Sequence, residues 1–350
     1  MSIEYENLQT QSSSFISSKN FEKNNHIKNQ SVSITNTNST TEDYDMEYQS
    51  NNSISLTKNS FISNSKNNHK KKEEIEKKLN LNFTFSSDEE AIKSSKEYIE
   101  EIYFNLLSEE KNKQINYGYM INQPDINDQM RGILIDWLIE VHFRFRLKPQ
   151  TLFLTVNIID SYLSIKLIHR AKLQLLGIAS LLIACKCEEI YYPPVKDFVD
   201  ITDKAYCKEE LINMEFLVLE TLNFNILNPT PCDFYDIISK FYHFNNQQYF
   251  LGKYFLESCL IDYRMTKYSS SILACSSIYL VMKFFGLKNY QLMYDSNMTK
   301  ENNSQKIIKQ AGKEICLLIR GLKSTNLKST IEKYSLKQFE SVSEFCEKNN

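Results

Sequence analysis

One stretch constrains the fold more than any other part of the chain: residues 130–145, which read MRGILIDWLIEVHFRF. Met130, Ile133, Leu134 and Trp137 follow one helical stripe, and further apolar side chains cover the other sides of the helix. A helix that is apolar nearly all round is normally buried on most of its sides. Four charged residues interrupt the stretch, so it is not a membrane span. The pattern therefore predicts the central helix of an all-helical domain.

The rest of the chain also has helical patterns. Its 350 residues include only 7 glycines and 6 prolines, which suits long helices joined by short turns better than sheets. Small residues around Gly177 predict a close approach of their helix to the central one. A similar mixture of small and branched residues returns near Ala274, which indicates two bundles of the same plan in tandem. Apolar periodicity predicts helices over 149–164, 170–188, 195–199, 208–222, 232–242, 247–264, 269–285 and 305–322.

The two ends of the chain differ from this helical region. The N-terminal part is rich in Asn, Ser, Lys and Thr and has no sustained apolar period. Such a segment buries too little apolar surface to offset its ordering entropy, so we expect it to be disordered. The last residues, from Thr330, are expected to form a poorly ordered tail. The predicted divisions are a disordered tail 1–90, an N-terminal helix and linker 91–126, a first bundle 127–227, a second bundle 228–328 and a C-terminal tail 329–350.

Charge and cysteine usage exclude several classes of protein. The formal net charge of −2 provides no strong field for nucleic acid or an acidic membrane, and no apolar run reaches membrane-spanning length. The eight cysteines form no CxxC pair and mostly sit in apolar runs. This usage predicts buried free thiols in a reducing compartment, the cytosol or the nucleus.

No set of residues suggests catalysis or metal binding. The five histidines are scattered without the spacing of metal ligands, and no glycine-rich loop is present to hold a phosphate. Cys185 and Cys187 are interpreted as core residues, because an apolar helix raises a thiol pKa. The sequence therefore predicts a protein without catalytic residues, metal or cofactor.

Four motifs in order resemble those of mitotic cyclins of the A/B type. Met130–Leu138 matches M-R-A-I-L-x-D-W-L apart from Gly132, and Lys172–Gly177 matches K-L-Q-L-V-G. Cys185–Tyr191 resembles S-K-x-E-E-I-Y, and Asn213–Phe224 matches the M-E…L…L-x-F run. The resemblance extends from Tyr98 to about Ser343. The C-terminal segment is more similar to B-type cyclins, although the usual F-L-R-R is absent after Phe234.

The resemblance implies an all-α pair of five-helix cyclin bundles that acts as a regulatory subunit and not as an enzyme. Such a chain binds and activates a cyclin-dependent kinase, recruits its substrates in the control of the cell cycle, with mitotic entry as the expected stage, and works in the nucleus and the cytoplasm. The partners implied are this kinase and proteins with arginine-x-leucine motifs, without nucleic acid or membrane. The kinase-binding residues implied are Lys186, Glu188, Glu215, Leu219, Phe224 and Ile226, together with Tyr98 and Ile102 on the preceding helix. The alternative for Lys186 and Glu215 is an intramolecular surface pair of little energetic value.

Two further sets follow from the resemblance. Arg131, Asp160 and Leu175 are expected to be structural, with the arginine paired to the aspartate inside the first bundle. The second set lines a groove for arginine-x-leucine peptides, in which Glu140 accepts the arginine. The alternative is that the groove stripe is simply core. The groove residues are Met130, Ile133, Leu134, Trp137, Glu140, Arg170 and Gln174.

Two rivals remain from the sequence. A DNA-binding initiation factor with the same two-bundle fold needs a basic face and usually a zinc ribbon, and the near-zero charge and absent CxxC argue against it. A transcription-type cyclin is disfavoured by the helix at Tyr98 and by the Lys172–Gly177 match.

Overall fold

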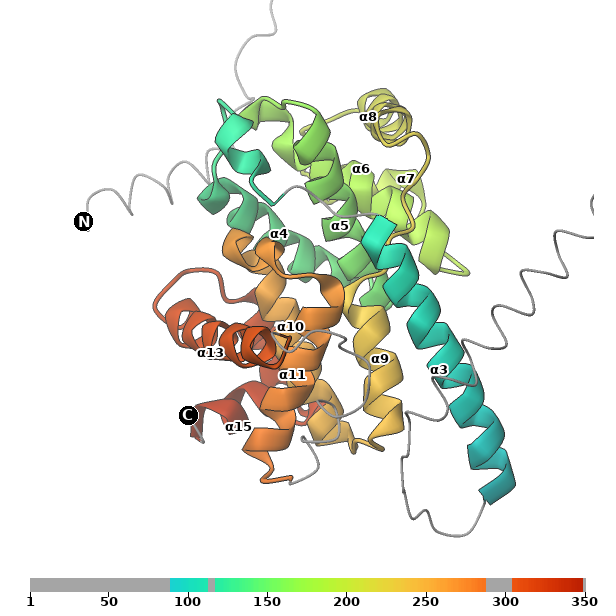
Figure 1. Cartoon of the computed structure of the whole chain (residues 1–350). Helices are drawn as coiled ribbons and strands as arrows, with labels where there is room; N and C mark the ends of the chain where they lie inside the picture. The colour runs from blue at the N-terminus through green and yellow to red at the C-terminus, as the bar shows by residue number, and fades with distance from the viewer. Residues whose placement is uncertain (1–88, 113–116, 288–303, 349–350) are drawn as a thin grey trace, which may run out of the picture. The chain divides into compact units, whose positions relative to one another are not determined.

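The computed structural model describes residues 89–112, 117–287 and 304–348, and every regular element within them is helical (Figure 1). The predicted disordered tail lies outside these residues, apart from its last two, which begin helix α3. The α-helices are α3 Glu89–Asn112, α4 Asp128–Arg144, α5 Pro149–Ile165, α6 Arg170–Glu188, α7 Val195–Asp200, α8 Lys208–Thr221, α9 Pro231–Phe241, α10 Asn246–Ile261, α11 Ser270–Phe284, α13 Ser304–Leu322, α14 Ser329–Ser335 and α15 Val342–Lys348. Short 3-10 turns, η1 Tyr119–Asn122, η2 Tyr263–Lys267 and η4 Lys337–Phe339, join some of them.

Helix α4 is apolar on nearly every side because two hydrophobic cores share it. Leu134 and Leu138 belong to the core of the first bundle, α4 to α8. Ile135 and Ile139, on the other side of the helix, belong to the core of the second bundle. Asn127 caps the helix by accepting a hydrogen bond from the Met130 amide, at 2.9 Å. The prediction of a central, buried helix is therefore confirmed.

The predicted close approach of α6 to α4 occurs at Gly177. A methyl group added at this glycine would lie 2.7 Å from Leu134 Cδ1, closer than van der Waals contact permits. The absent side chain thus lets the leucine fill the space between the two helices.

The second bundle contains α9, α10, α11 and α13. One prediction here was wrong, because the helix expected over 247–264 ends at Ile261. Asp262 adopts an extended conformation, and its side chain accepts a hydrogen bond from the Arg264 amide at 2.9 Å, which starts the 3-10 turn η2. An Asx contact of this kind competes with helix continuation.

The C-terminal segment is folded, in contrast to the predicted poorly ordered tail. Helices α14 and α15 pack on α10, and α14 also packs on α4. Lys333 on α14 donates to both carboxylate oxygens of Glu257, at 2.7 and 2.8 Å, and Tyr334 donates to the same carboxylate at 2.7 Å. All three side chains are buried. A charged side chain can lie in the core when it is fully paired, so the charged residues of this segment do not indicate a poorly ordered tail.

The two bundles are joined through the expected structural pair. Arg131 donates to both oxygens of Asp160 at 2.7 Å, and Tyr119 donates to the same carboxylate at 2.7 Å. Arg131 also donates to the Leu260 carbonyl of the second bundle at 2.9 Å. Leu175, the third residue of the structural set, is buried in the first core.

Candidate functional site

The ends of α6 and α8 bring Lys186 and Glu215 together. The lysine Nζ lies 2.5 Å from the glutamate Oε1, and the two side chains are 39% and 12% exposed. In the isolated chain these residues therefore form the intramolecular pair that was the alternative interpretation. A partly exposed pair contributes little to stability. The pair also presents one donor and one acceptor side by side on the surface.

Three apolar side chains follow Glu215 along the chain, at the end of α8 and in the segment after it. Leu219 and Ile226 are half-buried, and Phe224 is 65% exposed. Asn223 and Phe224 have φ angles of 49° and 57°, in the left-handed region, which asparagine adopts readily but which costs an aromatic residue roughly 1–2 kcal/mol. The fold therefore retains an unfavourable backbone conformation at Phe224 that holds an aromatic side chain in solvent, an arrangement typical of binding sites.

Helix α8 carries an outward apolar stripe that the sequence interpretation missed. Its inward stripe is buried and contains Leu211 and Met214. Ile212 and Phe216 are 40% and 60% exposed and lie on the other side, in line with Leu219. A second apolar stripe on one helix is visible in the sequence and could have identified these residues.

Helix α3 packs on the second bundle and leaves one face open. Tyr103 is buried, with its ring against Phe234 at a centroid distance of 5.7 Å. Glu110 accepts hydrogen bonds from the amide and the hydroxyl of Ser271, at 2.8 and 2.6 Å. The predicted residues Tyr98 and Ile102 are 67% and 50% exposed. They are therefore free to contact a partner.

The predicted groove is only partly a surface. Ile133 and Glu140 are exposed and Met130 and Trp137 are half-buried, but Leu134 is 5% exposed. Assigning the leucine to the groove surface was wrong, since it fills the space beside Gly177. On the facing helix α6, Gln174 is half-buried, and Arg170 is exposed with its Nε 2.8 Å from Asp125 Oδ1.

The cysteines partly follow the prediction. All eight are free, and Cys185 is buried with its thiol pKa raised to about 12 by burial. Placing Cys187 in the core was wrong, since it is exposed beside the kinase-binding residues implied by the sequence. Within the described part of the chain no cluster of three potential metal ligands occurs, and no helix is both long and apolar enough to span a bilayer.

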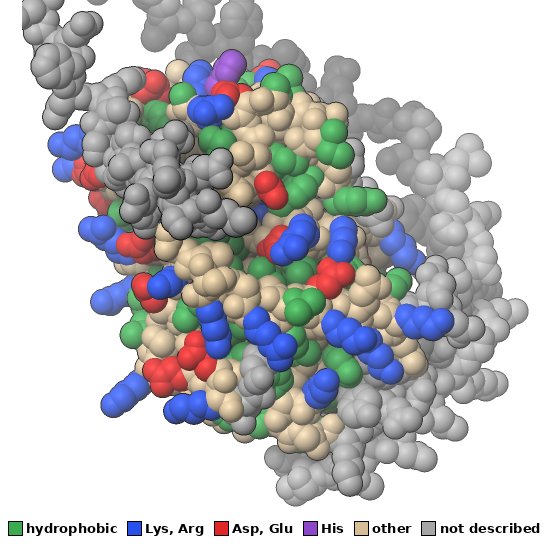
Figure 2. Space-filling view, turned by 90° about the vertical axis from the view of Figure 1, so that its left-hand side faces the viewer, with side chains coloured by type: hydrophobic (Ala, Val, Ile, Leu, Met, Phe, Trp, Pro, Cys, Tyr) green, Lys and Arg blue, Asp and Glu red, His purple; other side chains and the backbone are tan. Residues whose placement is uncertain are grey.

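The near-zero net charge does not describe the distribution of charge. Lys and Arg side chains gather over the lower part of the face in Figure 2, where the C-terminal helices lie. Exposed basic residues on α13 are Lys306, Lys309, Lys313 and Arg320. Acidic side chains are interspersed among them in the same view. A sum over the sequence cannot show this basic region.

Two titratable groups on α4 are expected to give opposite pH dependences of stability. Burial raises the pKa of Asp136 to about 6, so its contribution to stability falls as the pH rises from about 4 to about 6. Burial lowers the pKa of His142 to about 4, so its contribution is lost as the pH falls from about 6.5 to about 4.

We expect Asp136→Asn to lose stability more steeply than the wild type on acidification from pH 6 to pH 4. His142→Gln should instead lose less stability than the wild type over that range, as measured by urea midpoints. Parallel profiles for the three proteins would contradict this assignment.

Comparison with known proteins matches both bundles. Family models of the N-terminal and C-terminal domains of cyclins match residues 101–227 and 229–348. The chain is 45% identical to Cyclin-B2-1 of Oryza sativa subsp. japonica over 183 residues, 52% of this chain and 44% of that protein. It is 39% identical to the G2/mitotic-specific cyclin-B of Dictyostelium discoideum over 242 residues, 68% of this chain and 54% of that protein. The matches thus span about half the length of these curated relatives.

A solved structure has the same fold. The viral cyclin of herpesvirus saimiri superposes with a TM-score of 0.56 at 19% identity, over 62% of this chain and 97% of that one. The curated relatives named above are B-type, which agrees with the sequence of the C-terminal segment.

Proposed function

We propose, from the premise that the chain belongs to the cyclin family, that it is a non-catalytic regulatory subunit that binds and activates a cyclin-dependent protein kinase. Its similarity to a G2/mitotic-specific cyclin-B favours mitotic entry as the stage of the cell cycle that it controls. The observation that carries the proposal is the surface around Lys186 and Glu215, where α3, α6 and α8 leave apolar side chains exposed within the match to the N-terminal cyclin domain. We expect the protein to act in the nucleus and the cytoplasm.

The mechanism follows from differential binding. An apolar surface next to a fixed donor and acceptor can hold a helix of the kinase and satisfy backbone groups at its end. A subunit that binds the active arrangement of the kinase more tightly shifts the population toward it. In the active arrangement, the kinase's own lysine–glutamate pair forms at its ATP site and its activation segment is ordered. Adding the purified chain to a monomeric cyclin-dependent kinase should therefore raise phosphorylation of a short peptide, and no rise with any such kinase would refute the proposal.

Phe224 provides a test in which stability and affinity change in opposite directions. Phe224→Gly relieves the left-handed backbone, so the free energy of unfolding should rise by up to about 1 kcal/mol. The same change removes an exposed aromatic side chain from the proposed interface, and loss of a hot spot costs about 2 kcal/mol of binding. Asn223→Gly is the matched control, because it places a glycine at the preceding left-handed residue and keeps the aromatic ring. If both variants bind the kinase as the wild type does, Phe224 lies outside the interface.

We also propose that the exposed part of the groove docks substrates with arginine-x-leucine motifs. Met130→Ala/Trp137→Ala leaves Leu134 in the core and should not affect phosphorylation of a short peptide. The Michaelis constant for a protein substrate carrying the motif should rise roughly tenfold or more, since a single tryptophan hot spot is worth about 2 kcal/mol. Loss of both activities with a lowered melting temperature would mean that these side chains are core. Equal activity on both substrates would mean that the surface does not dock them.

A further inference from the structure

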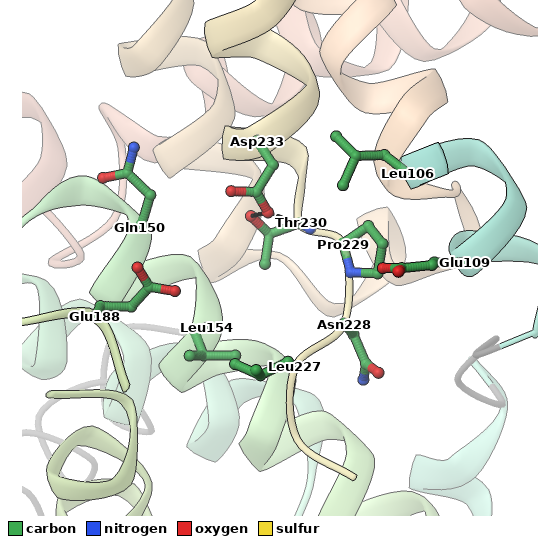
Figure 3. Close-up of a pocket in the computed structure, with 10 residues that line it drawn as sticks. All are labelled: Leu106, Glu109, Gln150, Leu154, Glu188, Leu227, Asn228, Pro229, Thr230 and Asp233. Carbon is green, nitrogen blue, oxygen red and sulfur yellow. Dashed lines mark hydrogen bonds between the residues drawn. The ribbon is translucent and has the colours of Figure 1, made fainter. Parts of the chain in front are cut away.

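An open pocket lies where four segments meet: α3, α5, the C-terminal end of α6 and the start of α9 (Figure 3). Its volume is about 160 Å³. Leu106, Leu154 and Leu227 provide apolar lining. Glu188 and Glu109 reach it from opposite sides, as Figure 3 shows. The pocket therefore combines apolar walls with carboxylates that come from different helices.

The carboxylates of the pocket differ in what they already bind. Asp233 accepts hydrogen bonds from the amide and the hydroxyl of Thr230, at 2.8 and 2.7 Å, and so caps α9. The ammonium group of Lys148 donates a hydrogen bond to the main-chain carbonyl of Glu188 and not to its carboxylate. In the described part of the chain the carboxylates of Glu109 and Glu188 make no hydrogen bond or ion pair. Among the described residues, nothing therefore occupies the oxygens of these two carboxylates.

The electrostatics of the pocket favour a cation. Glu188 is half-buried, and burial followed by the charge of the nearby Asp233 raises the pKa of its carboxyl group, while the ammonium of Lys148 offsets only part of this shift. A positive group placed between these carboxylates would relieve their repulsion. An uncharged occupant would leave the repulsion in place.

The pocket continues the proposed kinase-binding surface. Glu109 lies 7 residues after Ile102 and 11 after Tyr98, so the three side chains share one face of α3. Leu227 is the residue after Ile226 and is 59% exposed. A kinase bound to this surface would therefore cover the mouth of the pocket.

We infer that the pocket receives an arginine side chain of the kinase. This inference rests on the proposed function, and it adds Glu109 and Leu227 to the kinase-binding residues. The aliphatic part of an arginine packs on leucines while its charged end stays polar. Its planar guanidinium has five donors, which lets it bond carboxylates on two sides at once, whereas a lysine ammonium is a single point charge.

The test is the affinity of the full chain for the kinase at low and high salt. Glu109→Gln/Glu188→Gln should raise the dissociation constant roughly tenfold and make it less sensitive to salt. The melting temperature should stay constant or rise, since the substitution removes like-charge repulsion. Glu340→Gln/Glu344→Gln removes the same net charge from exposed residues of the C-terminal segment, outside the pocket and the proposed interface, and should leave the affinity unchanged. Each arginine of the kinase is then neutralised in turn. One of these substitutions should weaken binding to the wild-type chain but cause no further loss of affinity for the Glu109→Gln/Glu188→Gln chain.

Different results separate this inference from the proposed function. If the double variant binds as tightly as the wild type, with the same salt dependence, while Phe224→Ala binds weakly, the pocket inference is wrong and the function stands. A lysine identified by the same kinase scan in place of an arginine would overturn the choice of side chain. If the wild-type chain binds no cyclin-dependent kinase, the proposed function and this inference both fail.

Discussion

Asp160→Ala is expected to lower the free energy of unfolding by about 3–5 kcal/mol, because it leaves Arg131 buried without its counter-ion. The arginine side chain is 1% exposed, so water cannot replace the lost carboxylate. Tyr119 loses its acceptor at the same time. Since the same arginine donates to the Leu260 carbonyl of the second bundle, the loss should disturb both bundles. A urea titration followed by circular dichroism would measure the change.

Two variants control this prediction. Arg131→Met/Asp160→Leu removes both charges and should be less destabilised than the single variant, because no buried charge remains unpaired. Glu314→Ala removes a partly exposed partner of Lys267 and should change stability little. A change below about 1 kcal/mol for Asp160→Ala would show that the pair is not needed to join the bundles.

The central helix shows how far the sequence alone could predict the fold. The run at residues 130–145 has too many apolar residues for one buried face, and the structure supplies the reason, since Leu138 faces one core and Ile139 the other. The same property limited the prediction of the groove. When every side of a helix is apolar, periodicity cannot separate Leu134, which is buried, from Ile133, which is 40% exposed.

The missed features depend on contacts between residues far apart in the chain. Helices α14 and α15 are 7 residues each, too short for a clear apolar period. The burial of Lys333 depends on Glu257, which lies 76 residues away. The pocket containing Glu109 and Glu188 likewise draws on four segments. Local patterns predict which elements form, whereas such sites need the packing of the elements.

Exchanging the charges of the surface pair, in Lys186→Glu/Glu215→Lys, is expected to abolish activation of the kinase without unfolding the chain. The exchange keeps an ion pair between the same two positions, which lie 2.5 Å apart in the wild type, so the melting temperature should change little. A partner whose backbone accepts from the lysine and donates to the glutamate would instead face an acceptor with its acceptor and a donor with its donor, and each lost hydrogen bond to a charged group costs about 1.5–3 kcal/mol. The dissociation constant should then rise by about 100-fold or more.

The matched control for this exchange is a second surface pair outside the proposed interface. Lys267 Nζ lies 2.8 Å from Glu314 Oε2 in the second bundle, and the side chains are 39% and 27% exposed. Lys267→Glu/Glu314→Lys should therefore leave both stability and activation unchanged. Normal activation by the Lys186→Glu/Glu215→Lys protein would mean that the kinase binds elsewhere, even if the chain is a kinase activator. Loss of activation by both exchanged proteins would instead point to a general effect of reversing surface charges, and the assignment of Lys186 and Glu215 would then lose its support.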